Sequence, residues 1–376
     1  MRVMMLLALG ATPLLGQQSL PFSDARWRLA GDSTRIERVA GREALRMHTG
    51  SATRRDVVLQ DGTIDVDVMT TRRRSFVYVN FRIEDEANQE EFYLRPHKSE
   101  LPDAVQYAPV FRGQSAWQLY HGARGTAAPA FQPGVWTPVR LVLQRERAAF
   151  FVGDTINPVL VVRLAREPRP GYVSLSAFLP PGTPGSGAIA WFSNFRVRQA
   201  ATYAFRDQPE PPLPSGVVRQ WSVGAAFLPA TLEPTALEPA WTATMQAVTT
   251  EPNGMVELNR WIAMPEGLQR STTGDVGTVA RLRVTAEQAG LRRMELGFSD
   301  AATVFLNGRP LFHGDNSYVF LRRRDGLIAF DQATVFLPLN AGVNDIAIVV
   351  TDHFGGWGLM ARFPEASGLT VEPWAR

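Results

Sequence analysis

The chain contains no cysteine among its 376 residues. This absence excludes disulfide bonds, zinc–thiolate sites, cysteine nucleophiles and anchoring through a lipidated cysteine. Stability must therefore come from hydrophobic cores, and the chain is long enough to build two domains of ordinary size.

A strong excess of one charge is also missing, because 39 Lys and Arg stand against 36 Asp and Glu, a net charge of +3. The pI near 9.5 permits nucleic-acid binding. However, the basic runs are limited to "TRRRS" (71–75) and "LRRRDG" (321–326), each beside an expected strand. Such short runs are typical of solvated loops, so no nucleic-acid partner is expected.

Long hydrophobic runs are missing as well, and no stretch beyond the N-terminus reaches the length of a membrane helix. The start, "MRVMMLLALGATPLLGQQ", has one basic residue, an apolar core and then small and turn-forming residues. This layout predicts a signal peptide over residues 1–16 and a secreted or periplasmic protein. The alternative is a buried N-terminal strand.

Helical periodicity is scarce, and apolar and polar residues alternate in "FVYVNFRI", "WTPVRLVLQ", "YVSLSAF" and "WFSNFRV". Many short strands separated by turn residues predict an all-β protein built from β-sandwich or jelly-roll domains. "FRDQPEPPLPSG" (205–216) is rich in proline and glycine and predicts a linker. The expected domains are therefore residues 17–204 and 217–376.

Several strand-like segments of the first domain carry a resemblance to a known superfamily. They are "LQDGTIDVDVMT", "FVYVNFRIEDEANQEEFYLRP", "PGVWTPVRLVLQRERAAFFVGD", "GYVSLSAF" and "AWFSNFRV". Together they resemble the concanavalin A-like lectin/glucanase superfamily, particularly its laminin-G-like members. The resemblance implies a β-sandwich whose one concave sheet binds sugars.

Alternation divides the side chains of three expected strands between two faces. The residues expected in the core are Val77, Val79, Phe81, Ile83, Phe92, Leu94, Trp117 and Leu119. The residues expected together on the outward face are Tyr78, Asn80, Arg82, Glu91, Tyr93, Arg95, Gln118 and Tyr120. His97, Gln106 and Tyr107 are expected in a loop beside that face.

The outward set suits carbohydrate recognition, because aromatic rings cover the C–H faces of sugars and planar polar groups reach their hydroxyls. The alternative is an ordinary solvated sheet face on which tyrosines are present for their β-propensity. The sequence leaves both interpretations open.

Catalysis is less well supported, because a retaining glycosidase needs two carboxylates about 5–5.5 Å apart. "TIDVDV" places Asp65 and Asp67 in alternation but lacks the glutamates of the glucanase pattern. Glu91 with His97 is the remaining candidate pair for acid–base chemistry. No cofactor is expected; a structural calcium ion at Asp61, Asp85 or Asp154 is conceivable but has no supporting ligand spacing.

The second domain resembles the galactose-binding-like jelly roll. The residues that carry this resemblance are "GMVELNRWI", "SDAATVFLNGRPLF", "VFLPLNAGVNDIAIVV" and "GGWGLMARF". Asn307-Gly308 predicts a type I′ hairpin, and Trp357 is expected in the core. His313, His353 and Asp352 show no metal-ligand spacing.

These observations favour a secreted, non-enzymatic protein that binds a polysaccharide or glycan on its N-terminal lectin-like domain. One alternative is a glycoside hydrolase with non-standard catalytic carboxylates. Another is an envelope adhesion or structural protein.

Overall fold

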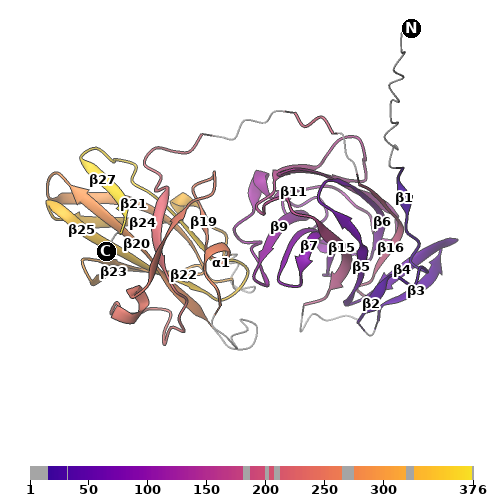
Figure 1. Ribbon diagram of the computed structural model, residues 1–376, viewed down its shortest axis with the longest axis horizontal. Helices are drawn as coiled ribbons and strands as arrows, with labels where there is room; N and C mark the ends of the chain where they lie inside the picture. The colour runs from indigo at the N-terminus through magenta and orange to yellow at the C-terminus, as the bar shows by residue number, and fades with distance from the viewer. Residues whose placement is uncertain are drawn as a thin grey trace, which may run out of the picture. The chain divides into compact units, whose positions relative to one another are not determined.

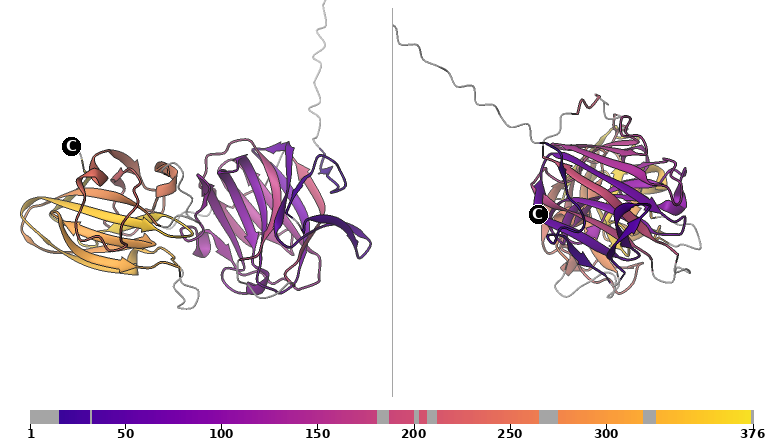
Figure 2. Two further views of the ribbon diagram at one scale, coloured as in Figure 1. Left: turned by 90° about the horizontal axis from the view of Figure 1, so that it is seen from below. Right: turned by 90° about the vertical axis from the view of Figure 1, so that its right-hand side faces the viewer.

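The computed structural model describes residues 16–31, 33–180, 187–199, 203–206, 212–264, 275–318 and 326–374 (Figure 1). The expected signal peptide lies outside the described residues except for Gly16, and so do residues 207–211 of the expected linker. Nearly all of the regular secondary structure in the described chain is antiparallel β-structure, as the alternation predicts, and Figure 2 shows strands through each part of it.

The N-terminal half contains two sheets. Sheet 1 has the order β14 (Leu160–Arg163), β13 (Arg147–Val152), β12 (Thr137–Gln144), β6 (Gly62–Thr70), β16 (Ala190–Arg198), β4 (Arg42–Met47) and β3 (Arg35–Val39), with β1 (Gln18–Ser19) beside β16. Sheet 2 has the order β10 (Gln114–Ser115), β9 (Val105–Phe111), β8 (Asn88–Leu94), β7 (Phe76–Asp85), β15 (Gly171–Phe178), β5 (Gly50–Leu59) and β2 (Arg28–Ala30), with β11 (Thr126–Ala127) beside β9.

The C-terminal half contains two more sheets. Sheet 3 has the order β18 (Met245–Thr249), β17 (Gln220–Gly224), β20 (Val276–Ala286), β25 (Gly342–Asp352), β22 (Ala301–Leu306) and β23 (Arg309–Asp315), with β27 (Leu369–Pro373) beside β20. Sheet 4 has the order β19 (Val256–Glu257), β26 (Gly358–Arg362), β21 (Gly290–Ser299) and β24 (Ala333–Leu339).

Helical structure in the described residues is limited to single turns. They are the 3₁₀ turns η1 (Pro96–Lys98), η2 (Gly122–Arg124), η3 (Pro239–Thr242) and η5 (Phe330–Gln332) and the short helix α1 (Leu258–Trp261). None of the helices in this part of the chain has the length and apolar character needed to cross a membrane.

The chain groups into two compact units. The first contains Met1–Ile83, Tyr93–Val105 and Ala127–Phe205, and the second contains Glu84–Phe92, Gln106–Thr126 and Arg206–Arg376. The second unit thus includes two segments that precede the proline-rich region in the sequence.

The core of the first unit follows the predicted alternation. Val77, Val79 and Phe81 of β7 are completely buried, and the ring of Phe81 lies 6.2 Å from that of Phe150 on β13. Because β7 belongs to sheet 2 and β13 to sheet 1, the two sheets face each other across these side chains. Burial of large apolar side chains contributes roughly 1.5–3 kcal/mol each and is the main stabilising term.

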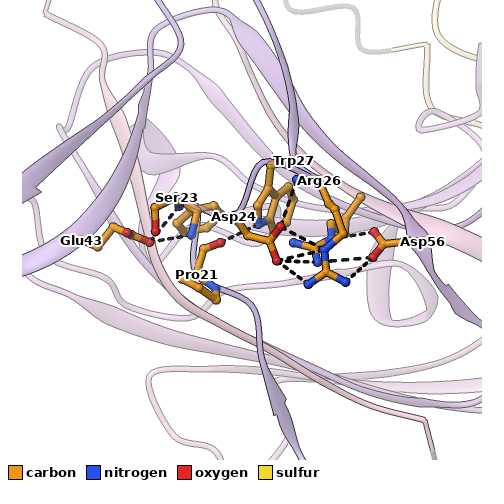
Figure 3. Close-up of polar contacts among 9 residues, drawn as sticks. Pro21, Ser23, Asp24, Arg26, Trp27, Glu43 and Asp56 are labelled. Atoms are coloured by element: carbon orange, nitrogen blue, oxygen red, sulfur yellow. Dashed lines mark hydrogen bonds and ion pairs between the residues drawn. The ribbon is translucent and has the colours of Figure 1, made fainter.

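A buried arginine, Arg54, links the start of the first unit to sheet 2, and Figure 3 labels its partners Asp24, Trp27 and Asp56. Arg54 of β5 has no exposed surface, and its guanidinium reaches Asp56 Oδ1 at 2.6 Å and Asp24 Oδ2 at 2.9 Å. The same guanidinium lies 5.6 Å from the ring centre of Trp27, and Arg26 also binds Asp24. Hydrogen bonds from Arg26 above all, together with Arg54, lower the pKa of Asp24.

The core of the second unit lies between sheets 3 and 4. Ile346 and Ile348 of β25 point into it, whereas Ala347 and Val349 point to the opposite face, where they contact Phe227 and Trp241. Trp357 is fully buried, as predicted, and its indole N–H donates to the carbonyl of Val350 at 3.1 Å.

The hairpin between β22 and β23 also confirms its prediction. Asn307 and Gly308 both have positive φ, +51° and +77°, as a type I′ turn requires.

Candidate functional site

Three neighbouring strands of sheet 2 define the outward face of the first unit. The register places Thr53, Ser174 and Asn80 in one row across β5, β15 and β7. The next row contains Ser51, Ser176 and Tyr78, and Phe178 lies opposite Phe76 at the end. We call this set, with Arg55 and Tyr172 at its other end, the outer face of sheet 2.

One end of the outer face is aromatic. The Tyr78 and Tyr93 rings lie 4.9 Å apart and are tilted by 36°, and the Phe76 ring lies 6.1 Å from Tyr93 and 6.3 Å from Phe178. Phe76 and Tyr78 are half-buried, whereas 42% of Phe178 is exposed. An exposed phenylalanine beside partly open rings offers the flat apolar surface that a sugar ring covers.

The middle of the outer face carries hydroxyl and amide groups. Thr53 Oγ1 and Ser174 Oγ are 3.1 Å apart, and Asn80 Nδ2 donates to Ser176 Oγ at 3.1 Å. Asn80 Oδ1 is buried and has no hydrogen-bond partner among the residues that the structure describes. An unsatisfied buried acceptor costs about 1–3 kcal/mol, so a donor that reached it would stabilise the amide.

Two side chains that were predicted to be exposed on this face are buried. Tyr78 is partly open as predicted, but Asn80 and Tyr93 are 7% and 3% exposed. Asn80 shares its row with two hydroxyl side chains, and Tyr93 is covered by its aromatic neighbours. Their expected exposure was therefore wrong, although both lie beside the outer face.

Arg95 was expected on the same face but follows the end of β8 at the start of η1. Its guanidinium lies 5.0 Å from the ring centre of Tyr93 and donates to the Tyr93 hydroxyl and to the carbonyl and carboxylate of Asp103. Only 5% of Arg95 is exposed, because it packs between the ring and this carboxylate. Its predicted exposure was wrong, and its direct contacts make it a support for Tyr93.

Arg82 does not belong to the outer face. Its φ is +48°, and the register between β7 and β15 shifts beside it. The side chain donates to the carbonyls of Gln60 (2.7 Å) and Arg145 (2.5 Å) and lies 3.3 Å from Asp61. The β-bulge interrupts the alternation, so the prediction for Arg82 was wrong.

Gln118 and Tyr120 were also expected to be exposed on a strand. Residues 116–120 instead form a turn, in which the amides of Leu119 and Tyr120 donate to the carbonyl of Ala116. Because these residues do not form a strand, alternation does not assign their side chains to faces. Gln118 and Tyr120 are 0% and 8% exposed, so their predicted exposure was wrong. The Tyr120 hydroxyl donates to Glu251, and burial raises the pKa of Tyr120.

Gln106 and Tyr107 belong to β9 and not to a loop. Gln106 donates to the carbonyls of Trp117 and Tyr120, and the Tyr107 hydroxyl donates to Glu90. All of these contacts lie within the second unit. They make Gln106 and Tyr107 structural residues.

The two catalytic candidates have separate surroundings. Glu91 accepts hydrogen bonds from Ser115 Oγ at 2.9 Å and Gln89 Nε2 at 3.2 Å, and burial raises its pKa to about 7. His97 packs against Phe76, with ring centres 5.8 Å apart, and burial followed by the charge of Lys98 lowers its pKa to about 4. The contacts described for the two residues have no member in common, so they do not show the predicted acid–base pair.

The carboxylates considered for calcium have protein donors. Asp61 accepts from the Arg145 amide, Asp85 from the Ala87 amide and Asp154 from the Ile156 amide. Within the described residues, no group of three or more His, Asp and Glu side chains could hold a metal ion.

Asp65 and Asp67 also have protein donors. Asp65 binds Arg140 at 2.7 Å, and Asp67 binds Arg42 at 2.9 Å and Asn194 at 2.6 Å. Both carboxylates are thus held by side chains of sheet 1 or its turns.

A second group of aromatic residues lies within the second unit. Trp117 meets Tyr318 and Phe354 edge to face, at 5.7 and 6.1 Å, the Tyr318 and Phe354 rings lie 5.8 Å apart and are tilted, and 53% of Phe354 is exposed. Asp300 Oδ2 accepts the amide N–H groups of His353 and Phe354, both at 2.7 Å, and thereby holds their loop. His353 also binds Asp275 at 2.7 Å, an interaction that raises the pKa of the imidazole.

The sequence did not predict this group. Trp117 and Phe354 are separated by more than half the chain, and no local pattern joins them. The glycines of "HFGGWG" were a partial signal, since a Cβ on Gly355 would lie 2.6 Å from Trp117 Nε1.

A shallow depression lies on the outer side of sheet 1. It is lined by Gln144, Arg145, Glu146, Arg147, Tyr203, Ala204 and Phe205. The Arg147 guanidinium lies 4.6 Å from the ring centre of Phe205, so the aromatic surface there is already covered.

No protein-family model and no curated protein sequence matches the chain. Similar solved structures include carbohydrate-binding module CBM66 from Bacillus subtilis, with 12% identity and a TM-score of 0.35 over 46% of this chain and 95% of that one. Bacillus licheniformis β-glucanase has 11% identity and a TM-score of 0.38 over 50% and 99%.

A β-1,3-1,4-glucanase (lichenase) derived from a mouse hindgut metagenome has 11% identity and a TM-score of 0.38 over 49% of this chain and 98% of that one. The identities and TM-scores are low, and these structures carry no conclusion about what this chain binds or does.

Proposed function

We propose that this protein is exported and binds a carbohydrate on the outer face of sheet 2. The observation that carries the proposal is the combination of partly exposed rings, Phe76, Tyr78 and Phe178, with hydroxyl and amide groups on the same three strands. Sugars present apolar C–H faces and a rim of hydroxyls, and this surface offers a partner for each. The export of the protein rests on the N-terminal sequence alone.

Rigid support favours the same surface. The Tyr93 ring lies between Tyr78 and the Arg95 guanidinium, and Arg95 is itself held by Asp103. A ring supported in this way loses little conformational freedom when a ligand covers its neighbours, which reduces the cost of binding.

Affinity gel electrophoresis with a panel of soluble polysaccharides tests the proposal. Covering ~50 Å² of the Phe178 ring is worth roughly 1.3 kcal/mol at about 25 cal/mol per Å². Phe178→Ala should therefore weaken the retention of the protein by about tenfold.

Phe336→Ala is the matched control, because Phe336 is also a strand phenylalanine, 55% exposed, but lies in the second unit. The proposal is supported if at least one polysaccharide retains the wild-type protein and if Phe178→Ala, but not Phe336→Ala, reduces that retention. No retention on any polysaccharide, or equal loss in the two variants, refutes it.

Hydrolysis is a second candidate function, and one observation favours it. Burial raises the pKa of Glu91 to about 7, which suits a general acid at neutral pH. Binding remains the better supported proposal, because the contacts described for Glu91 and for His97 are separate and do not join the two residues into an acid–base pair.

A further inference from the structure

Lysine occurs only once in the sequence. Of the 39 Lys and Arg residues, Lys98 is the single lysine and all the others are arginine. An arginine side chain keeps its proton, whereas the ε-amine of a lysine can lose its proton and attack a carbonyl carbon. Lys98 is therefore the only side chain of the protein that offers a primary amine to an aldehyde.

Lys98 lies beside the aromatic end of the outer face. The ring of the preceding residue, His97, is 5.8 Å from that of Phe76. The Lys98 ammonium and the Arg95 guanidinium bind the same oxygen, Asp103 Oδ2, and the guanidinium lies 5.7 Å from the Phe76 ring centre. Two routes of direct contact, one through His97 and one through Asp103 and Arg95, thus connect the lysine to a ring of the proposed binding surface.

The amine is accessible and has an acid–base partner. The Lys98 side chain is 37% exposed, whereas Arg95, which binds the same carboxylate, is only 5% exposed. The hydrogen bond from Lys98 to Asp103 keeps a carboxylate beside the amine. A carboxylate in this position can accept a proton from a carbon atom that becomes bonded to the amine nitrogen or lies next to that carbon.

We propose that Lys98 is a covalent modification site for reducing sugars that bind at the aromatic end of the outer face. The inference rests on the proposed carbohydrate binding, which brings the sugar to the amine. The unprotonated ε-amine attacks C1 of the open-chain aldehyde, a C–N bond forms, and the carbonyl oxygen leaves as water to give an imine.

The imine then rearranges to a stable ketoamine. Asp103 removes the proton on C2 of the protonated imine, a proton is added to C1, and the C2 hydroxyl loses its proton to become the ketone. C1 is reduced while C2 is oxidised, so the step needs no external oxidant or reductant. A sugar held beside the amine reacts within one complex, which raises the rate over that of a free sugar.

Reductive labelling of the full-length protein tests the proposal. Sodium cyanoborohydride traps the imine, and peptide mass spectrometry locates it. The probes are the reducing trisaccharides cellotriose, laminaritriose, xylotriose and maltotriose, and glyceraldehyde is the control because it is too small to cover an aromatic ring. The α-amino group of the expressed chain is the internal reference, since it is the other primary amine and lies outside the outer face.

For at least one trisaccharide, labelling of Lys98 relative to the α-amino group should exceed that obtained with glyceraldehyde by about tenfold or more. Phe178→Ala should reduce this trisaccharide labelling by about tenfold, in line with its expected loss of affinity, and should leave glyceraldehyde labelling unchanged. Phe336→Ala should change neither. Lys98→Arg, which keeps a cation for Asp103, should give no side-chain adduct.

The outcomes separate the two proposals. Equal trisaccharide labelling of Lys98 in wild type and Phe178→Ala overturns the modification site, and so does labelling that no trisaccharide raises above the glyceraldehyde ratio. In both cases, gel retention that depends on Phe178 leaves carbohydrate binding standing. Lack of retention on every polysaccharide refutes the proposed function and, with it, the modification of Lys98 by a bound sugar.

Discussion

Asp300 makes the stability of the second unit depend on pH in a defined window. The side chain is 1% exposed, and burial raises its pKa from 3.8 to about 6, although the amides of His353 and Phe354 oppose the shift. Asp300→Asn removes the charge while its carbonyl oxygen can still accept from the same two amides.

The direction of the effect follows from proton binding. Between pH 3.8 and about 6 the folded protein retains a proton on Asp300 that the unfolded chain has released. Folding stability from this group therefore falls as pH rises through that window. One pKa unit corresponds to ~1.4 kcal/mol, so a shift of about two units corresponds to roughly 3 kcal/mol.

Urea unfolding between pH 4 and pH 8, followed by tryptophan fluorescence, measures this dependence. Relative to that of wild type, the unfolding free energy of Asp300→Asn should rise by about 2–3 kcal/mol between pH 4 and pH 7. Asp275→Asn is the control. It removes the interaction that raises the pKa of His353, so the stability that it costs should be constant below the ordinary histidine pKa of 6.5 and should diminish only as pH rises above that value. A constant difference between Asp300→Asn and wild type across pH 4–7 would refute the reasoning.

Three further predictions concern other parts of the chain. Arg54→Ala should lower the unfolding free energy by about 3–5 kcal/mol because it leaves two carboxylates without their buried partner. Arg26→Gln, at a mostly exposed side chain, should cost less than about 1 kcal/mol in the same urea titration. Glu91→Gln should abolish any release of reducing sugar, and release that persists excludes Glu91 as the acid. A fragment of residues 217–376 lacks Gln118, which bonds to Ser299, Asp300 and Gly355, and should melt roughly 10 °C below the second unit of the whole chain. Equal melting temperatures would show that residues 106–126 are dispensable.

The sequence predicted strand faces well wherever a strand is regular. Val77, Val79 and Phe81 are buried because alternation holds along that part of β7. Alternation fails at Arg82, where the register between β7 and β15 shifts between Tyr172 and Ser174; a Cβ at the adjacent Gly171 would lie 2.3 Å from the Arg82 carbonyl carbon. A glycine at the start of "GYVSLSAF" was the available signal of that irregularity.

The candidate site could be predicted only in part for a different reason. Tyr78 was found from one strand, but Ser174, Ser176 and Phe178 join it through pairing with a strand about a hundred residues away. The prediction that Gln118 is exposed was wrong because "AWQLY" alternates in sequence yet folds as a turn. Asp300, the hydrogen-bond partner of Gln118, lies 182 positions further along the chain. Strand register and long-range partners of this kind are not encoded in local periodicity.

Oxidative footprinting of the aromatic side chains, with the polysaccharide that the affinity gels select, tests the central claim most directly. The account predicts that the ligand protects Phe76, Tyr78 and Phe178 and leaves Tyr318 and Phe354 of the second unit unchanged. Protection of Tyr318 and Phe354 without protection of Tyr78 and Phe178 would contradict it, since the carbohydrate would then bind elsewhere.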